Sequence, residues 1–354
     1  MPLAEIILAA MWICLTAYAL FGGADFGGGF WDLIAGRAEA GRPQRNLIEH
    51  SIGPIWEANH VWLIFVIVLA WTGMPSVFAA ISSTLYIPLT LAALGIIARG
   101  SAFAFRKVST ELWQQRLFGA TFAASSVLTP FFLGAVAGAL ASDRVPPGIA
   151  AGHPIWSWVN PTSMVSGVFA VGTTAYLAAV YLTQDARRVG DPALVDAFRS
   201  RALAAGCVMG ILAVAELIVL SFDAPQLFRE LTAGPALPFA IASAAAGVAS
   251  LVLMWRRQFL AVRLSAALAV TALLWGWGVG HYPEILPGAT VDEVAATESV
   301  LSANLIAIIV AGLLVIPSLW WLYAMFQRDQ RSTETGPTSE SQAAGTGDHP
   351  RGGH

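Results

Sequence analysis

The sequence has very little charge. Only 12% of its 354 residues are Asp, Glu, Lys or Arg, whereas 56% are hydrophobic, and ordinary soluble domains carry about 25% charged residues. So few charges cannot cover a soluble globule of this size. The basic residues form no stripe of the kind that binds nucleic acid, and the net charge of −3 indicates no particular partner. We therefore expect an integral membrane protein with no nucleic-acid partner.

Cysteine and the common enzyme motifs are also scarce. Cys14 and Cys207 are the two cysteines; both fall inside predicted spans, in different halves of the membrane, so we expect no disulfide and assign them to packing. The sequence contains no Walker A motif, no GxGxxG after a strand, no nucleophile elbow and no CxxC pair. Most soluble enzyme chemistry is thereby excluded, and we predict no catalytic residue in this chain.

Long apolar runs are what the sequence has instead. A helix needs about 20 apolar residues to cross a hydrocarbon core of roughly 30 Å. The sequence predicts an all-α fold of about nine transmembrane helices, in two parallel four-helix bundles plus one extra helix. The predicted spans are approximately 4–24 (running on towards 35), 53–73, 76–98, 117–141, 162–184, 202–222, 237–255, 260–281 and 301–326.

The connections between these spans predict the orientation, because Lys and Arg accumulate in short cytoplasmic loops. Alternate connections and the C-terminal tail hold 17 of the 19 basic residues, and the opposite face holds only Arg144 and Arg229. We therefore expect the N-terminus outside and the C-terminus in the cytoplasm. The 17 residues are Arg37, Arg42, Arg45, Arg99, Arg106, Lys107, Arg116, Arg187, Arg188, Arg199, Arg201, Arg256, Arg257, Arg263, Arg328, Arg331 and Arg351.

The ends of the chain differ in character. Residues 1–5 lack the positive region of a cleaved signal peptide, so the first apolar run is expected to stay as a membrane helix. Residues 1–326 form the predicted transmembrane domain, and 327–354, rich in Ser, Thr, Gly, Glu and Gln, form a predicted disordered cytoplasmic tail. The longer external loops, 142–160 and 282–300, could cover a partner or form a short surface helix.

A few charged residues interrupt the apolar runs, where charge is costly and usually marks a functional path or a polar contact between helices. Asp25 lies in "GGADFGGGFWD", Glu57 in "IGPIWEANHVW" and Glu216 in "GILAVAELIVL". Asp25 and Glu57 lie roughly 10–16 Å inside the cytoplasmic face on neighbouring antiparallel helices, at about 1.5 Å per residue. We predict that they are steps of one proton path. Glu216 has no polar neighbours in its run and is the weaker candidate.

The segment around Glu57 also contains a histidine. One helical face can present Trp56, Glu57 and His60 together, with Asn59 and Trp62 extending the cluster. Glu-x-x-His is half of a di-metal carboxylate site, but no second copy exists, so we predict no metal site. His60 is the only histidine well inside a span, so a bis-His haem held by this chain alone is not expected either.

Several sequence motifs narrow the choice among possible functions. "GADFGGGFWDLIAG" ending the first span and "SIGPIWEANHVWLI" opening the second resemble subunit II of the cytochrome bd-type quinol oxidases, including the cyanide-insensitive branch. The similarity continues through "ARGSAFAFR", "TPFFLGAVAGAL", "NPTSMVSGV" and "HYPEILPG", up to the tail. The resemblance implies a complex of the bacterial cytoplasmic membrane that oxidises quinol and reduces dioxygen to water. It also implies that haems b and d and the quinol-oxidising loop belong to a partner, subunit I.

The resemblance carries over to single residues. Asp25 matches the acid of the Gly-rich motif, and Glu57 matches the acid after Trp, which is Asp in some members. The remaining motif positions are matched by Trp56, Asn59, Trp62 and Arg99. His60 stands where other members carry Gln, which implies a role in local polarity and none as a ligand. An acid that many members carry early in span 4 is replaced here, at about Gly119.

Two other functions remain open at this stage. A secondary transporter would need broken helices and repeats around a midplane site, and Gly22 to Gly29 is the only candidate break. A purely structural subunit would use the acids as polar contacts only. Further partners of such a complex could be small accessory membrane subunits and a lipid or quinone, and the Trp56 region could pass either protons or oxygen.

Overall fold

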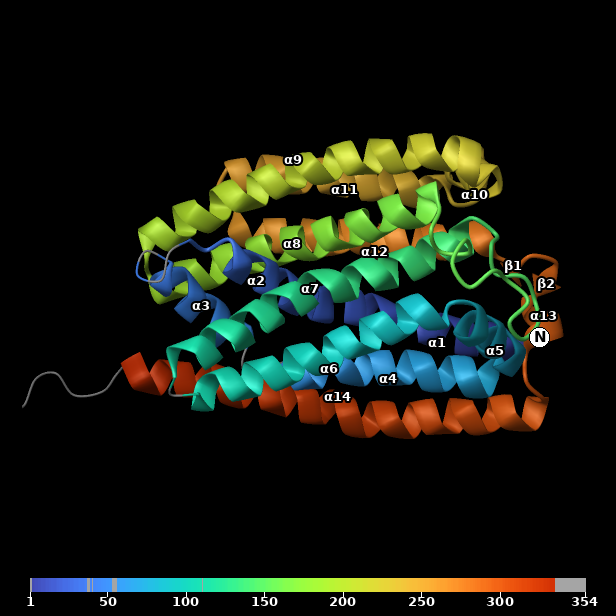
Figure 1. The fold of residues 1–354 in the computed structure, drawn as a ribbon, viewed down its shortest axis with the longest axis horizontal. Coiled ribbons are helices and arrows are strands. Elements are labelled where there is room, and N and C mark those ends of the chain that lie inside the picture. Colours follow the sequence, from blue (N-terminus) through green and yellow to red (C-terminus); the bar gives the residue numbers. More distant parts are fainter. Residues whose placement is uncertain (1, 37–38, 40, 53–55, 110, 335–354) are drawn as a thin grey trace, which may run out of the picture. The chain divides into compact units, whose positions relative to one another are not determined.

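The protein is almost entirely helical (Figure 1). The computed structural model describes the backbone of residues 2–36, 39, 41–52, 56–109 and 111–334, and the side chains of these except 2, 52, 56–58, 107, 112 and 322–334. The elements are α1 (Pro2–Ala17), the π-helix η1 (Tyr18–Gly22), α2 (Gly23–Leu33), α3 (Arg42–Ile52), α4 (Trp56–Gly73), α5 (Pro75–Thr84), α6 (Tyr86–Val108), α7 (Leu112–Ala141), α8 (Pro161–Val189), α9 (Pro192–Asp223), α10 (Pro225–Ala233), α11 (Leu237–Trp255), α12 (Phe259–His281), β1 (Glu284–Leu286), β2 (Ala289–Thr290), α13 (Val291–Val294) and α14 (Glu298–Glu334).

The predicted membrane fold is confirmed. In the described part of the chain, eight helices are long and apolar enough to cross a membrane, and the bent pair α4–α5 makes a ninth candidate. The first of them is the continuous stretch Leu3–Leu33, which includes η1 and α2. Both cysteines are free. Residues 335–354 lie outside the described residues, so the disordered tail stays a prediction.

The third predicted span, 76–98, is wrong in its position. The chain bends by 116° between Asn59–Gly73 and Pro75–Thr84, and the membrane-length helix is Tyr86–Arg106. Two prolines explain the breaks, because proline has no N–H to continue a helix. Pro75 starts α5 after the non-helical Met74, and Pro88 cannot donate to the carbonyl of Thr84, where α5 ends.

This shift moves Arg99 out of the predicted cytoplasmic connection. Arg99 lies well inside α6, and only 2% of its surface is exposed. It therefore does not belong among the 17 basic residues that were assigned to one face. Helices α8 and α9 also run past their predicted spans, 162–184 and 202–222, towards the short turn at Gly190–Asp191.

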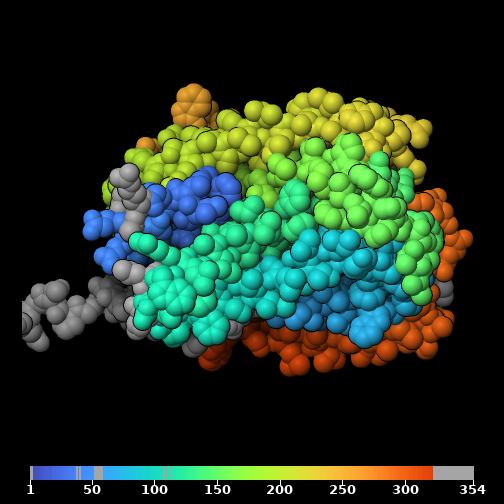
Figure 2. Space-filling view, in the orientation of Figure 1, coloured from blue at the N-terminus to red at the C-terminus, as the bar shows by residue number. Residues whose placement is uncertain are grey.

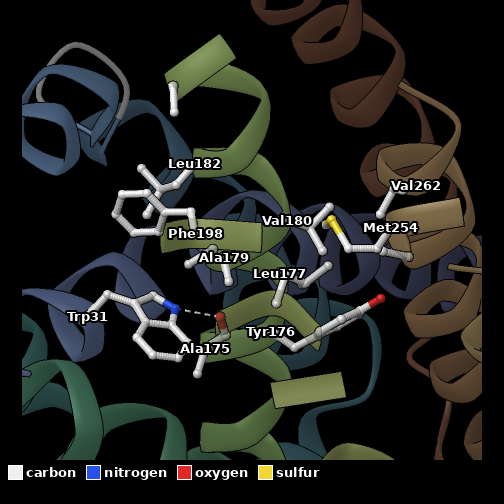
Figure 3. Packing of buried hydrophobic residues seen from close by; sticks show 14 of the residues in the cluster. Trp31, Ala175, Tyr176, Leu177, Ala179, Val180, Leu182, Phe198, Met254 and Val262 are labelled. Atoms are coloured by element: carbon white, nitrogen blue, oxygen red, sulfur yellow. Dashed lines mark hydrogen bonds between the residues drawn. The ribbon is translucent and has the colours of Figure 1, made fainter. Parts of the chain in front are cut away.

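Helix α8 joins the two helical groups that were predicted. The first group contains α1, α2, α4, α6 and α7, and the second contains α8, α9, α11 and α12. Helix α8 contacts α7 and α2 on one side and α9 and α12 on the other. Its buried residues Tyr176 to Val180 pack with Phe198, Met254 and Val262 of the second group (Figure 3). Trp31 of α2 donates from its indole nitrogen to the Ala175 carbonyl at 2.7 Å, which ties the two groups together.

Glycines let α2 approach its neighbours closely. A Cβ atom at Gly27 would lie 1.8 Å from the carbonyl oxygen of Thr174 in α8, and one at Gly29 would lie 2.1 Å from Oγ of Ser126 in α7. Small residues allow such backbone contacts between membrane helices. The Gly-rich motif therefore holds the helix that carries Asp25 against both α7 and α8.

The two longer loops pack at the end of the helices where α8 begins. In loop 142–160, the backbone N–H of Ala150 donates to Ser83 Oγ at 2.7 Å, so this loop covers the end of α5 (Figure 2, green beside cyan). The loop after α12 forms a two-stranded hairpin, β1–β2, which was not predicted from the sequence. The short helix α13 follows with a capping box between Thr290 and Glu293, and that hydrogen bonding lowers the pKa of Glu293.

We predict that Gly27→Ala destabilises the protein by about 1–3 kcal/mol or more, because the added methyl group must displace the α8 backbone. The matched control is Gly210→Ala in α9, where a Cβ would meet nothing within 4 Å. Alanine at that position should leave stability unchanged or raise it by up to about 1 kcal/mol. Thermal unfolding of the purified protein in detergent measures both. Equal melting temperatures for the two variants would contradict the close α2–α8 contact.

A second prediction concerns Asp143, which has a left-handed backbone (φ 54°) in the loop after α7. Burial raises the pKa of this carboxyl, His281 opposes the shift and Glu284 adds to it. The raised pKa means that the folded state is favoured below the ordinary Asp pKa of about 4 and loses stability as pH rises through the folded pKa. Asp143→Asn should therefore raise the melting temperature at pH 7 and have little effect at pH 3.5. A gain of the same size at both pH values would exclude the titration as its cause.

Candidate functional site

The candidate site begins at an irregular turn of the first helix. Residues Tyr18–Gly22 form a π-helix, a form that is rare and often occurs at functional sites. Gly22 makes room for it, since a Cβ there would lie 2.9 Å from the Tyr18 ring. Asp25 follows within the first turn of α2 and is 8% exposed. The carboxyl group is thus held inside the helical group, away from lipid.

Asn59 is the hydrogen-bond partner of this acid. Its Nδ2 donates to Oδ2 of Asp25 across the α2–α4 boundary, and Asn59 is 2% exposed. Two further polar atoms beside this contact, Oδ1 of Asn59 and the hydroxyl of Tyr18, are buried without a hydrogen-bond partner in the described structure. A buried polar atom without a partner is uncommon in proteins and needs an explanation. The Asp25–Asn59 pair is therefore only partly satisfied.

Arg99 closes the site from α6. Its Nη2 donates to the backbone carbonyl of Asp25 at 2.8 Å, and its Nε donates to Ser126 Oγ at 3.2 Å. The guanidinium carbon lies 4.8 Å from the ring centroid of Phe26 and 5.0 Å from that of Phe122. Cation–π contacts of this kind stabilise a cation away from water. One buried guanidinium thus connects α2, α6 and α7.

A small pocket lies further along α2, near Asp32. Asp32 follows Asp25 by seven residues, about 10 Å along the helix. Its carboxylate pairs with Arg106 at 3.0 Å and with Arg45 at 3.5 Å. The pocket is lined by Asp32, Arg45, Ile48, Glu49, Phe103, Arg106 and Phe122. Phe122 thus contacts both the pocket and the Arg99 guanidinium.

The structure brings together three of the predicted residues, Asp25, Asn59 and Arg99. His60 lies beside them, with its ring centroid 6.2 Å from that of Tyr18 and 6.5 Å from that of Phe26. Trp62 lies in the same helix, α4, and is partly exposed. Glu57 and Trp56 also belong to α4, but their side chains lie outside the described residues. Their part in the path stays a prediction.

Glu216 lies apart from this site, in the second helical group. Its Oε1 accepts a hydrogen bond from Ser166 of α8 at 2.5 Å. Several parts of the first site were not predicted from the sequence: Tyr18, Phe26, Phe122, Ser126 and the Asp32 ion pairs. Tyr18, Phe26, Phe122 and Ser126 are uncharged, so they lack the signal that identified Asp25, which is a charge within an apolar run.

No group of three or more His, Cys, Asp or Glu in the described residues could hold a metal ion. For haem, His60 is the histidine to consider, and the rings of Tyr18 and Phe26 pack around it. The other histidine within a described span, His281, donates from Nδ1 to the Trp277 carbonyl at 2.7 Å, and its ring centroid lies 4.4 Å from that of the Trp277 indole. These surroundings do not fit an axial ligand pair, and no chemical step is assigned to haem in this chain.

Comparison with known proteins decides the family. The family model for cytochrome bd terminal oxidase subunit II matches residues 3–326. The chain belongs to this family. The match ends where the predicted transmembrane domain ends, and it confirms the resemblance that the Gly-rich and Trp-Glu motifs indicated.

Individual members of the cytochrome bd subunit II family are distant. Subunit 2 of the cytochrome bd ubiquinol oxidase of Bacillus subtilis (strain 168) is 31% identical over 129 residues, 35% of this chain and 37% of that protein. Subunit 2 of the Escherichia coli (strain K12) cytochrome bd-I ubiquinol oxidase is 27% identical over 186 residues, 51% of this chain and 47% of that protein. The chain thus matches less than half the length of either relative.

Two other matches extend over nearly the whole chain. A putative cytochrome bd menaquinol oxidase subunit II of B. subtilis is 22% identical over 342 residues, covering 93% of this chain and 96% of that protein. A chain in the structure of the bd oxidase from Geobacillus thermodenitrificans has a TM-score of 0.74 and 23% identity, and the match covers 92% of this chain and 99% of that one. At this identity the structural match establishes that the two chains share a fold.

We predict that Arg99→Lys destabilises the protein by about 1–3 kcal/mol, because an ammonium group cannot replace the planar fork that reaches two acceptors and stacks on two rings. The control is Arg188→Lys, whose side chain is 57% exposed and pairs with Asp185, and which should cost less than about 0.5 kcal/mol. Thermal unfolding in detergent compares them. Similar melting temperatures would show that the Arg99 contacts do not hold the helices together.

Proposed function

We propose that the chain acts as subunit II of a cytochrome bd-type terminal oxidase, which oxidises quinol and reduces dioxygen to water in aerobic respiration. In this proposal the complex lies in the bacterial cytoplasmic membrane, and haems b and d are bound by the partner, subunit I. The family membership supports this assignment, as do the motifs that carry Asp25 and Glu57. This chain would position subunit I and supply protons to the reaction.

The observation that carries the proton role is the partly satisfied pair of Asp25 and Asn59. A cluster that served only to join helices would be expected to satisfy all its buried polar atoms, because each unsatisfied one is costly. Here the Tyr18 hydroxyl and Oδ1 of Asn59 have no partner among the described residues. Polar atoms with spare hydrogen-bonding capacity beside an acid suit a group that exchanges protons.

The pocket at Asp32 supports a direction for the path. Lys and Arg crowd the end of the helices at which α2 ends and α3 begins, which the positive-inside rule assigns to the cytoplasm. Protons would enter at the pocket around Asp32, pass Phe122 and Arg99, and reach Asp25. Glu57, near the start of α4, would be the second acid of this path.

We predict that Asp25→Asn and Glu57→Gln each slow oxygen consumption by roughly tenfold or more, because the amide cannot take up and release a proton. Arg99 binds the backbone carbonyl of Asp25, so the Asn variant should keep that contact. The control is Asp196→Asn, which changes an exposed acid paired with Arg257 and should leave turnover unchanged. Quinol-driven oxygen uptake, expressed per haem in the purified complex, measures all three.

The haem content of the same preparations separates the rival functions. Slow turnover at normal haem content supports the proton path. Loss of the haem-bearing subunit in both acid variants would instead indicate a purely structural role. Full activity of both variants would contradict the proton path. A secondary transporter predicts that the native protein purifies colourless and without a second large subunit. The oxidase proposal requires the bands of haems b and d in the visible spectrum.

A further inference from the structure

A second acidic site lies in the other helical group. Glu216 precedes the end of α9, at Asp223, by seven residues, which places it about 10 Å from that end. One carboxyl oxygen accepts from Ser166 Oγ at 2.5 Å, while the other, Oε2, is buried without a partner in the described structure. The rest of the Glu216 side chain is partly exposed on the α9 surface. The acid therefore turns its free oxygen inward.

Hydroxyl groups lead from this acid towards the start of α8. Ser163 and Ser166 lie one turn apart, and Ser163 Oγ is buried without a partner among the described groups. Helix α7 covers both serines through Gly138, where a Cβ would lie 2.5 Å from the Ser163 Cα and 2.8 Å from Ser166 Oγ. The contact leaves room for no larger side chain at Gly138, so these hydroxyls are enclosed between α7, α8 and α9.

An ion pair lies beyond these hydroxyl groups, at the start of α8. Asp223 accepts from the backbone N–H and the hydroxyl of Thr162, at 3.2 and 2.6 Å, in the first turn of α8. Arg144 binds the same carboxylate with two nitrogens, at 2.6 and 2.9 Å, and its side chain is 31% exposed. The row Glu216, Ser166, Ser163, Thr162 and Asp223 thus runs from the apolar interior to a charged group at the surface.

Charge near Glu216 is sparse. Helix α11 has no titratable residue, and those of α8 all lie more than two turns beyond Ser166: Tyr176, Tyr181, Asp185, Arg187 and Arg188. In the half of α7 that faces Ser166, from Thr121 to Ala141, no residue is charged. On α9 the nearest charge is Asp223, which is already paired with Arg144. A carboxylate with one hydrogen bond in such surroundings is unfavourable relative to the neutral acid.

We propose that Glu216 is a proton-binding site that exchanges its proton with the side of the membrane on which α8 begins, through Ser166 and Ser163. This site is separate from Asp25, and it opens to the opposite end of the helices from the Asp32 pocket. It does not depend on the proposed oxidase function. The structure shows one hydrogen bond of this route, from Ser166 to Glu216. The unpaired Ser163 hydroxyl, one helical turn away, is the next group that can take up the proton, and the Asp223–Arg144 pair lies at the surface end of the route.

A membrane-soluble carbodiimide tests the protonation. The reagent takes the proton of a neutral carboxylic acid on one nitrogen while a carboxyl oxygen adds to its central carbon, and the adduct rearranges to a stable N-acylurea. In the complete protein in membranes, mass spectrometry should find this adduct on Glu216 at pH 7, with less adduct as pH rises. The Glu216→Gln variant should carry none there, and the exposed Asp196, ion-paired with Arg257, should stay unmodified.

The Ser166→Ala variant tests the hydrogen bond. It removes the one donor that the described residues supply to the carboxylate, so the pH of half-maximal labelling should rise by about one unit, a tenfold change in proton affinity. Sealed vesicles with different pH inside and outside test the route. Labelling should follow the pH on the side of loop 142–160, which a cysteine placed at Ala150 identifies through an impermeant thiol reagent.

Each result decides the proposal. Adduct on Glu216 that falls with pH, shifts in Ser166→Ala and follows the pH on the loop side supports it. No adduct on Glu216 between pH 5 and 9, or labelling that follows the pH of the other compartment, overturns it. Oxygen consumption is not part of the test, so failure of the oxidase proposal would leave these results unaffected.

Discussion

The buried guanidinium of Arg99 is the constraint on which the first helical group depends. A charge at this depth is stable only where acceptors and aromatic faces surround it. Those groups come from α2 through Asp25 and Phe26, and from α7 through Ser126 and Phe122. The glycines of α2 are the necessary counterpart, because bulkier residues would move this helix away from α7 and α8. The Gly-rich motif and the distant arginine thus form one structural unit.

The two acidic sites use different means to keep a carboxyl group in the membrane. Asp25 lies near a positive charge and an amide, with unsatisfied polar atoms beside it. Glu216 has only a serine hydroxyl, and no ion pair of the described residues includes it. The first arrangement tolerates an ionised acid and the second disfavours it. Helix α8 lies between them, so the same helix packs against the α2 of one site and donates to the acid of the other.

Much of the fold could be predicted from the sequence, because a span needs only a run of apolar residues. Where the prediction failed, the structure depends on one or a few residues within a longer apolar or loop sequence. The breaks before α5 and α6 come from Pro75 and Pro88, two single residues that leave the stretch around them apolar. The same error assigned Arg99 to a connection, since an arginine directly after an uncharged stretch of span length, residues 76–98, looks like the end of a span. The β1–β2 hairpin spans only seven residues, too few for strand periodicity to be recognised.

The two acidic sites could also be predicted only in part. The distance of Asp25 and the Glu57 segment from the same loop predicted that they would lie at one depth, and Asn59 of that segment does contact Asp25. Depth along a helix says nothing about rotation around it, so the contact of Glu216 with Ser166, fifty residues earlier, left no local trace. A polar residue in an apolar run therefore predicts that its side chain has a hydrogen-bond partner, but not which residue that is. Only the packing of α7, α8 and α9 identifies the partner, and with it the end of the membrane to which the acid connects.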